Sequence, residues 1–423
     1  MTPPFDPAAA LTGAAARSVL RVAVLGAGTV GSAVVRGFLE RAERLAVARG
    51  PRLELAGVAT VDPDRARELG VPDRLITDAA AHLATAPDVD IVVELIGGQE
   101  PARTFVRSAL EAGKPVVTAN KALLAAHGPE LEALARASGV PLRFEAAVGG
   151  GIPVLGPLAG DLAANRLAAV RGIVNGTTNF ILTAMAEEGR DYAEVLRDAQ
   201  AAGYAEADPT ADVEGGDAAS KIVILARLAF GGWLAPQAVV RAAPRLRGPG
   251  LPGITGVTGT DVAGAAEHGL VLRLVASARP AAGGRIAASV VPTAVPVDSP
   301  LGRTRGVLNR VEVDGTPVGS VAFAGPGAGG DATSSAVLGD LVAIARGAGS
   351  TWAGLPEAEA VRSDPVAAEE AWLAAERRWL AVVPGGPAIV SREPLTARAF
   401  RDELASLLPD DADAALYPVE GLA

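Results

Sequence analysis

The chain of 423 residues contains no cysteine, and this absence excludes disulfide bonds, thiolate metal sites and thiol nucleophiles. It has only three histidines, His82, His127 and His268, and none is paired at the spacing of metal ligands, so no histidine-based zinc site is expected. No apolar run reaches the roughly 18–20 residues that span a bilayer. The net charge of −10 argues against a basic, nucleic-acid-binding face. We therefore expect neither a membrane nor a nucleic-acid partner.

The N-terminal stretch also lacks the basic start and apolar core of a signal peptide. We expect residues 1–18 to form a flexible tail and the protein to be cytoplasmic. Hydrophobic residues make up 49% of the chain and charged residues 20%, which suits two or three folded domains at this length.

Lysine is nearly absent, because arginine supplies 35 of the 38 basic residues and the three lysines are Lys114, Lys121 and Lys221. An ammonium group is compact and can give up a proton, whereas a guanidinium stays charged. The surviving lysines are therefore candidates for positions where arginine cannot serve; the alternative is that they are scattered by chance. Asparagine is also scarce, with five positions, one beside Lys121 and two around residues 176–178.

A dinucleotide-binding fingerprint follows a short apolar run at residues 20–25 and precedes a helical stretch over residues 32–49. Its residues are Gly26, Ala27, Gly28, Thr29, Val30 and Gly31. In a strand–loop–helix context, the first glycine makes the tight turn, the second lets the backbone approach a pyrophosphate, and the third lets the helix pack on the strand. The helix N-terminus then faces the phosphates.

Further strand-like runs alternate with helical segments up to about residue 150; they cover residues 53–60, 89–96, 115–118 and 142–146. This alternation predicts a parallel, doubly wound Rossmann domain over residues 19–151. Its ligand crevice should lie at the carboxyl ends of the strands, where Lys121 follows one of them. Lys114 precedes its strand, away from that side, and is expected to be an ordinary surface charge.

The second strand ends close to Asp62, and an acidic residue there usually bonds the ribose hydroxyls and favours NAD. Arg65 and Arg67 follow, and either guanidinium suits the extra phosphate of NADP. The alternative is that Asp62 only caps the next helix. The choice between NAD and NADP stays open at this point.

The pattern changes after residue 151. Helices are expected at residues 179–188, 192–202 and from about 214 to 230, and strands at 171–175, 270–278, 286–292, 307–313 and 319–324. Short gaps between the later strands predict a mainly antiparallel sheet, and hence an α+β catalytic and dimerisation domain over residues 152–330. A helix over 331–348 is expected to return to the nucleotide domain, and residues 349–423 to form a small C-terminal extension of unknown role, giving an α/β protein overall.

The chemistry-bearing stretch runs from Glu206 to Lys221 and holds five acidic residues. Asp217 and Lys221 are separated by four positions, so they share one face of the expected helix. The alternative is a solvated ion pair beside an acidic capping loop. Aldehyde reduction needs a cofactor that supplies hydride and a protein group that protonates the developing alkoxide, and a lysine beside a carboxylate suits that task.

Taken together, these motifs resemble homoserine dehydrogenase. The resemblance covers about residues 20–347 and is carried, in the family's order, by residues 26–31, 94–98, 117–124, 144–153, 172–179, 203–221 and 325–340. It implies reversible NAD(P)H-dependent reduction of L-aspartate 4-semialdehyde to L-homoserine, a step in threonine, methionine and isoleucine biosynthesis. It also implies a homodimer or homotetramer.

The resemblance also assigns roles to residues. It implies Lys221 as the proton donor with Asp217 beside it, and it implies contact with substrate for Glu206, Thr177, Tyr204, Asp212 and Lys121. Lys121 would also lie near the cofactor, and Gly329 would touch the cofactor from a second glycine-rich loop. Members of the family bind a monovalent cation, usually sodium, and the matching positions here are Glu145, Val148, Gly150 and Ile152.

Two departures from the family pattern are visible. Many members carry an arginine near the end of the second strand, where this chain has Val61, and the C-terminal stretch shows no ACT regulatory signature. Two alternatives stay open: another Rossmann oxidoreductase acting on a small amino or hydroxy acid, and a non-catalytic nucleotide sensor. The Gly203–Lys221 stretch discriminates against the first, because a generic member would not need it. Loss of Lys221 or Asp217 would favour the sensor, and both residues are present.

Overall fold

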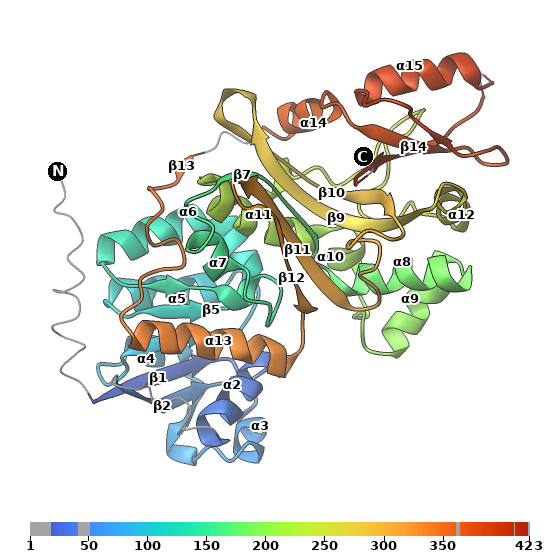
Figure 1. The fold of residues 1–423 in the computed structure, drawn as a ribbon. Helices are drawn as coiled ribbons and strands as arrows, with labels where there is room; N and C mark the ends of the chain where they lie inside the picture. Colours follow the sequence, from blue (N-terminus) through green and yellow to red (C-terminus); the bar gives the residue numbers. More distant parts are fainter. Residues whose placement is uncertain (1–17, 41–50, 361–363, 410, 422–423) are drawn as a thin grey trace. The chain divides into compact units, whose positions relative to one another are not determined.

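The computed structural model describes residues 18–40, 51–360, 364–409 and 411–421 (Figure 1). The chain divides into two compact units. The first ends at Ala163 and also takes in Ala328–Ala358, and the second comprises Ala164–Gly327 and the chain from Glu359 onward. The expected N-terminal tail up to residue 17 and the expected helical residues 41–49 lie outside the described residues. Within the described part of the chain, every helix is too short or too polar to cross a lipid bilayer.

The first unit is built on a six-stranded sheet with the order β3-β2-β1-β4-β5-β6, and all its pairs are parallel. The strands are β1 (Val19–Leu25), β2 (Arg52–Ala59), β3 (Ile76–Thr77), β4 (Ile91–Glu94), β5 (Val116–Thr118) and β6 (Leu142–Arg143). The strand order reverses between β1 and β4, and in doubly wound sheets this switch point is where ligands bind. The Rossmann-type architecture is confirmed.

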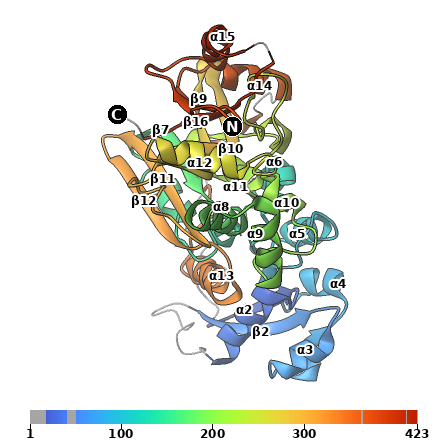
Figure 2. The same cartoon turned by 90° about the vertical axis from the view of Figure 1, so that its right-hand side faces the viewer.

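Among its described residues, the helices of the first unit surround this sheet or extend its loops: α2 (Thr29–Glu40), α3 (Pro63–Glu68), α4 (Ala80–Thr85), α5 (Ala102–Glu111), α6 (Lys121–Ser138), α7 (Leu155–Ala159) and α13 (Gly330–Ala345). Helix α13 packs against α2, although almost 300 residues separate them (Figure 2). Val337, Leu338 and Leu341 share one core with Val34 and Phe38. Burial of each such side chain contributes about 1.5–3 kcal/mol, so α13 is part of this unit's core.

The expectation that Lys114 is a surface charge was wrong. Its side chain is buried, with 8% exposed, and its ammonium donates to the carbonyls of Ala86 (2.8 Å) and Val89. Buried charges need such partners, and these two carbonyls lie in the loop that precedes β4. Lys114 therefore has a structural role at the amino-terminal side of the sheet.

The strand expected to run to Ala146 ends at Arg143, because Glu145–Ala147 forms a 3₁₀ turn. The backbone N–H of Phe144 donates to the Thr351 hydroxyl and that of Glu145 to the Asp340 carboxylate. These side-chain acceptors replace the ladder hydrogen bonds that would continue the strand.

The second unit is built on an eight-stranded sheet with the order β12-β11-β7-β9-β10-β16-β14-β15. Its strands are β7 (Arg166–Ile173), β9 (Leu270–Ala281), β10 (Arg285–Pro296), β11 (Leu308–Thr316), β12 (Gly319–Pro326), β14 (Arg378–Val382), β15 (Ile389–Val390) and β16 (Ala415–Val419). All pairs are antiparallel except β10 with β16, so the expected mainly antiparallel sheet is confirmed.

The helices of the second unit are α8 (Gly176–Glu188), α9 (Tyr192–Ala201), α10 (Thr210–Val213), α11 (Gly216–Phe230), α12 (Gly259–Glu267), α14 (Pro365–Leu373) and α15 (Ala397–Leu407). A two-stranded sheet pairs β8 (Gly232–Trp233) with β13 (Glu359–Ala360). The C-terminal residues thus contribute three strands to the main sheet of this unit, where β16 extends β10 through the pairing of Val419 with Ala294. They share a sheet with β7, the strand that leads to α8.

Candidate active site

The glycine loop after β1 has the geometry of a dinucleotide-binding turn. Gly26 has φ +102°, and a Cβ there would lie 2.6 Å from the Leu95 carbonyl oxygen. A Cβ on Gly31 would lie 1.9 Å from the Gly26 carbonyl oxygen, whereas one on Gly28 would meet nothing within 4 Å. The first and third glycines are therefore required for close packing of backbone, and the second leaves open space where a pyrophosphate approaches the start of α2.

A second glycine loop adjoins the first one within the same unit. Gly329 has φ +108° and precedes α13, and a Cβ on Gly330 would lie 2.8 Å from the Thr29 carbonyl oxygen. The N-termini of α2 and α13 therefore approach each other closely. Two helix N-termini with exposed backbone N–H groups suit a ligand with two phosphates, so these residues fit the dinucleotide that the fingerprint predicts.

Lys121 is the first residue of α6, and its neighbours fix where that helix begins. The side-chain oxygen of Asn120 accepts from the Leu123 N–H (3.0 Å), and the side-chain nitrogen of Asn120 donates to the Gly98 carbonyl (2.7 Å). Buried Glu94, which sequence reasoning did not single out, holds the same edge: it accepts from the Thr118 hydroxyl (2.6 Å) and from the N–H groups of Ile96 and Gly97. Lys121 therefore lies at the carboxyl end of the parallel sheet.

Asp62 caps α3, because its carboxylate accepts from the N–H of Arg65 at 3.1 Å. Arg67 is engaged by Asp64 and Asp73, while Arg65 donates from Nε to the Ser32 hydroxyl at 3.0 Å. Asp62 is therefore a helix cap, but an exposed capping carboxylate keeps free lone pairs for a ribose hydroxyl, so capping is compatible with a cofactor contact.

Much of the acceptor capacity of the Glu145 carboxylate is used by backbone N–H groups. Its oxygens accept from the N–H groups of Val154 (2.8 Å), Leu155 (2.8 Å) and Gly156 (2.7 Å) at the start of α7. Burial nevertheless raises the pKa of Glu145, and the nearby Asp340 carboxylate adds to this, against the three N–H groups. Burial likewise raises the pKa of Asp340, against its ion pair with Arg143 (2.7 Å) and the N–H of Glu145.

The loop after Glu145 offers backbone carbonyls instead. Val148, Gly150 and Ile152 are buried, and within the described residues none of their carbonyls accepts a backbone hydrogen bond. The described residues also hold no cluster of three or more His, Asp or Glu side chains suited to a metal ion. A cation here would therefore be held by backbone oxygens, the donor set that suits Na⁺ better than a transition metal.

The second unit brings together most of the residues predicted for proton transfer and substrate binding. Lys221 on α11 is buried, with 7% exposed, and its Nζ donates to Asp217 Oδ2 (2.7 Å) and to the Val174 carbonyl (2.6 Å). Their side chains are each 9% exposed, which contradicts the alternative of a solvated ion pair. Because a carboxylate and a carbonyl both accept from this buried ammonium, the position of the Lys221 Nζ is fixed.

Two further predicted residues, Thr177 on α8 and Asp212 on α10, join this group. The Thr177 hydroxyl donates to the Tyr204 carbonyl (2.7 Å) and approaches Asp212 Oδ2 (3.2 Å). Asn175, to which the sequence assigned no role, donates from Nδ2 to both Asp212 Oδ1 (2.7 Å) and Asp217 Oδ2 (3.0 Å). Asp212, Asp217, Lys221, Asn175 and Thr177 therefore form one hydrogen-bonded group, called the lysine cluster below.

Tyr204 and Glu206 lie on the loop between α9 and α10. The Tyr204 ring packs on Phe180 with centroids 5.0 Å apart and is 47% exposed. The Glu206 side chain is exposed, and within the described residues its carboxylate forms no hydrogen bond; only its backbone carbonyl accepts, from Gln200 (3.1 Å). The structure therefore does not join Glu206 to the lysine cluster.

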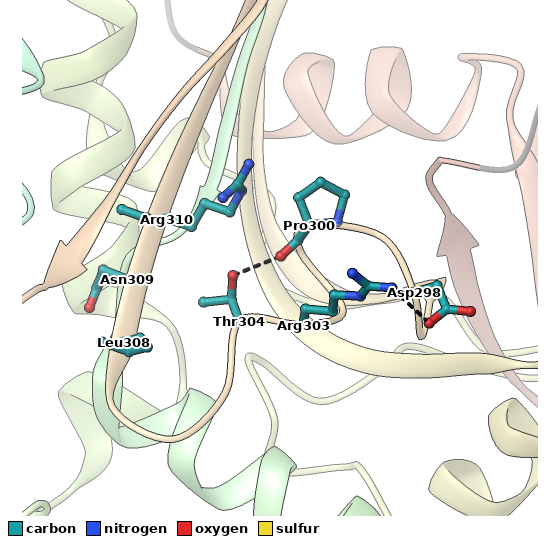
Figure 3. A pocket seen from close by; sticks show the side chains of 8 residues that line it. Asp298, Pro300, Arg303, Thr304, Leu308, Asn309 and Arg310 are labelled. Atoms are coloured by element: carbon teal, nitrogen blue, oxygen red, sulfur yellow. Dashed lines mark hydrogen bonds and ion pairs between the residues drawn. The ribbon is translucent and has the colours of Figure 1, made fainter.

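A pocket of about 390 Å³ lies elsewhere in the second unit, on the segment 298–304 and strands β11 and β12 (Figure 3). Its lining residues are Asp298, Pro300, Arg303, Thr304, Leu308, Asn309, Arg310 and Ala324. Arg303 pairs with Asp298 (3.2 Å), and the Thr304 hydroxyl donates to the Pro300 carbonyl (2.9 Å). None of the predicted site residues is among the lining residues, so the volume of a pocket alone does not locate the chemistry here.

Two family models match the chain: homoserine dehydrogenase, NAD binding domain, over residues 26–145, and homoserine dehydrogenase over residues 153–342. Homoserine dehydrogenase of Corynebacterium glutamicum is 45% identical over 369 residues, which are 84% of this chain and 79% of that protein. The enzyme of Mycobacterium tuberculosis is 47% identical over 331 residues, covering 77% of this chain and 72% of that protein.

Solved structures agree with these sequence matches. A homoserine dehydrogenase from Thiobacillus denitrificans superposes with a TM-score of 0.84 at 32% identity, covering 96% of this chain and 99% of that one. A hyperthermophilic archaeal homoserine dehydrogenase in complex with NADPH superposes with a TM-score of 0.64 at 26% identity, covering 77% of this chain and 97% of that one.

Proposed function

Because the chain belongs to the homoserine dehydrogenase family, we propose that Lys221 and Asp217 carry the proton transfer of its reaction. The chain is an NAD(P)-dependent oxidoreductase, and the reaction interconverts L-aspartate 4-semialdehyde and L-homoserine. The observation that supports the two residues most directly is the buried Lys221 ammonium, held by Asp217 and the Val174 carbonyl.

The nicotinamide cofactor supplies the hydride when bound. Lys221 donates a proton to the alkoxide oxygen that forms from the aldehyde carbonyl, and it takes the proton back from the alcohol in the reverse direction. Asp217 Oδ2 orients the ammonium through the 2.7 Å hydrogen bond and balances its charge. Because Asp217 and the Val174 carbonyl already hold the Lys221 ammonium in place, little reorganisation is needed when the proton moves.

The substrate carries an ammonium and a carboxylate besides its aldehyde. We propose that the Asp212 and Glu206 carboxylates bind the ammonium, and that Thr177 and Tyr204 line the same site. Asp212 already shares hydrogen bonds with Asn175 and Thr177, which leaves part of its acceptor capacity for a ligand. The exposed Glu206 has no competing side-chain partner among the described residues and is therefore able to turn toward a bound amine.

The cofactor is assigned to the first unit. We propose that Gly26, Ala27, Gly28, Thr29, Val30 and Gly31 hold the pyrophosphate, that Gly329 contributes from the second glycine loop, and that Lys121 contacts cofactor or substrate at the edge of the sheet. The Ser32 hydroxyl donates to the Ala27 carbonyl (2.8 Å), which fixes the peptide plane of the loop before any ligand arrives.

We also propose a monovalent cation, probed as Na⁺, at the carbonyls of Val148, Gly150 and Ile152, with the Glu145 side chain bracing the loop. Replacing sodium by choline in the assay should lower turnover. A homodimer or homotetramer and a cytoplasmic location stay part of the proposal, and sedimentation of the purified protein tests the oligomeric state.

The test is oxidation of L-homoserine with NAD and with NADP, measured for the wild type, Lys221→Ala and Asp217→Asn. General acid–base catalysis contributes about 10²- to 10⁴-fold, so we expect kcat to fall by that factor in Lys221→Ala. Ser220→Ala is the matched control, because within the described part of the chain the Ser220 hydroxyl bonds only the Gly216 carbonyl, one turn earlier in α11. Wild-type turnover in Lys221→Ala would remove the lysine from the mechanism, and absence of any activity in the wild type would favour a nucleotide sensor.

A further inference from the structure

Asn175 occupies the point where three elements of the lysine cluster meet. It is the residue before α8, it follows β7 by two positions, and its side chain bonds Asp212 on α10 and Asp217 on α11. The side chain is buried, with 5% of the residue exposed. The residue before it, Val174, supplies the carbonyl that accepts from Lys221. The Val174–Asn175 dipeptide therefore contacts the lysine directly and also contacts its carboxylate.

The orientation of the Asn175 amide is fixed from both sides. Its Oδ1 accepts from the Thr178 N–H (2.9 Å) and the Thr178 hydroxyl (2.9 Å), as the cap of α8. Its Nδ2 faces two carboxylates, Asp212 at 2.7 Å and Asp217 at 3.0 Å. A flipped amide would place its oxygen against the oxygens of two carboxylates and its nitrogen against an N–H group, so the hydrogen-bond network permits only one orientation.

This amide supplies what two neighbouring carboxylates need. Like charges in a poorly solvated site repel each other, and such a pair commonly responds by protonating one member or by turning apart. Asn175 donates one N–H to each carboxylate without adding charge. The Asp217 oxygen that receives this N–H is Oδ2, the same atom that receives the Lys221 ammonium. Asn175 therefore fixes which oxygen of Asp217 faces the lysine.

We propose that Asn175 is a positioning residue of the reaction: it bridges Asp212 and Asp217 and thereby holds Asp217, and through it Lys221, in the orientation for proton transfer. This proposal rests on the assignment of Lys221 and Asp217 made above. Serine and aspartate cap helices about as well as asparagine does, and threonine only somewhat less well, so capping of α8 does not require this residue type. Among them only asparagine supplies two N–H donors to the carboxylates.

The experiment is a double-mutant cycle on L-homoserine oxidation with Asn175→Ser, Asp217→Asn and the double variant. Serine keeps the cap of α8 and removes both N–H donors. A misplacement of about 1 Å costs on the order of 10²-fold in rate, so we expect Asn175→Ser to lower kcat by about 10- to 100-fold. In the Asp217→Asn background the same substitution should cost less than about threefold, because residues that act as one unit are not additive.

A merely structural role of Asn175 predicts a different result, namely the same loss of kcat in both backgrounds, and that result would overturn the proposal. Thr183→Val is the matched control on the same helix: among the described residues the Thr183 hydroxyl bonds only Asn179 and Gly306, so its loss should lower stability without lowering kcat by more than about twofold. If Asn175→Ser does not fold, Asn175→Thr supplies the same test.

Lys221→Ala, assayed beside the cycle, separates the two levels of the account. An active Lys221→Ala variant would contradict the assignment of the proton donor itself. An inactive Lys221→Ala variant together with an additive cycle would contradict only the positioning role of Asn175.

Discussion

The nucleotide loop and the lysine cluster are built from different parts of the polypeptide. In the loop at Gly26–Gly31 the backbone forms the site, and a side chain on Gly26 or Gly31 would collide with a carbonyl oxygen. In the lysine cluster the side chains form the site: Asn175 donates to Asp217 at 3.0 Å, and Lys221 donates to Asp217 at 2.7 Å. A backbone site is damaged by added atoms, whereas a side-chain site is damaged by exchanged functional groups.

The comparison extends to the way each region handles buried charge. In the first unit the Glu145 carboxylate is bound by three backbone N–H groups at the start of α7. In the second unit the Asp217 carboxylate is bound by a lysine and an amide side chain. Backbone donors stay in place after a side-chain substitution, so the first unit should tolerate changes of charge better than changes of shape.

The largest effect is expected for Gly31→Ala. A Cβ there lies 1.9 Å from the Gly26 carbonyl oxygen, so the loop and α2 must move apart. We expect a loss of about 3 kcal/mol or more in the free energy of unfolding and loss of cofactor binding. Thermal unfolding with and without NADPH measures both, and a variant of wild-type stability would contradict the close packing of this loop.

Gly28→Ala should separate binding from folding in the same loop. The added Cβ meets no protein atom within 4 Å, so stability should change by less than about 0.5 kcal/mol. The methyl group occupies the space where the pyrophosphate approaches, and the cofactor Kd should rise about 10- to 100-fold. Fluorescence titration with NADPH measures this Kd, and an unchanged value would place the pyrophosphate elsewhere.

Asp340→Asn tests buried charge in the first unit. Burial raises the pKa of Asp340 despite the ion pair with Arg143, so its contribution to stability is fully present below the unfolded pKa of about 3.9 and is lost as pH rises through the raised folded pKa. The stability difference between the wild type and Asp340→Asn should therefore shrink as the pH rises from 4 to 7.

Thermal melts at several pH values measure this difference. Asp331→Asn, whose side chain is 86% exposed at the start of the same helix, is the control for removing one charge from α13. A difference that grows with pH would mean that the ion pair with Arg143 outweighs burial.

The smallest effect is expected at Asp62, where two substitutions separate capping from cofactor choice. Asp62→Asn keeps a capping oxygen for the Arg65 N–H and removes the negative charge, so stability should stay constant while the preference for NADP over NAD rises several-fold. Asp62→Ala should also lose about 1 kcal/mol of stability. An unchanged ratio of kcat/KM for the two cofactors in both variants would limit Asp62 to capping.

The sequence predicted the parts of this molecule whose signal is local. The glycines at 26, 28 and 31 have a fixed spacing because a turn has fixed geometry, and the Asp217–Lys221 spacing follows from one helical turn. Both features are present where they were expected. The scarcity of lysine correctly drew attention to Lys221, because a buried ammonium that bonds a carboxylate and a carbonyl is not easily replaced by a guanidinium.

The parts that the sequence missed depend on partners far along the chain. Lys114 looked like a surface charge because its partners, the carbonyls of Ala86 and Val89, carry no sequence signal. The end of β6 at Arg143 is set by Asp340 and Thr351, about 200 residues away. Asn175 was visible as a scarce residue type within the family segment 172–179, but no role was assigned to it, since its bridge to Asp212 and Asp217 exists only once α8, α10 and α11 are folded.

The most direct test of the division between the two regions is the NADPH affinity of Lys221→Ala. If the backbone of the first unit binds the cofactor and the side chains of the second unit move the proton, this variant loses turnover but keeps its Kd for NADPH within about twofold of the wild type. A Kd raised by tenfold or more in a folded Lys221→Ala protein would show that the lysine belongs to the cofactor site, and would contradict the account.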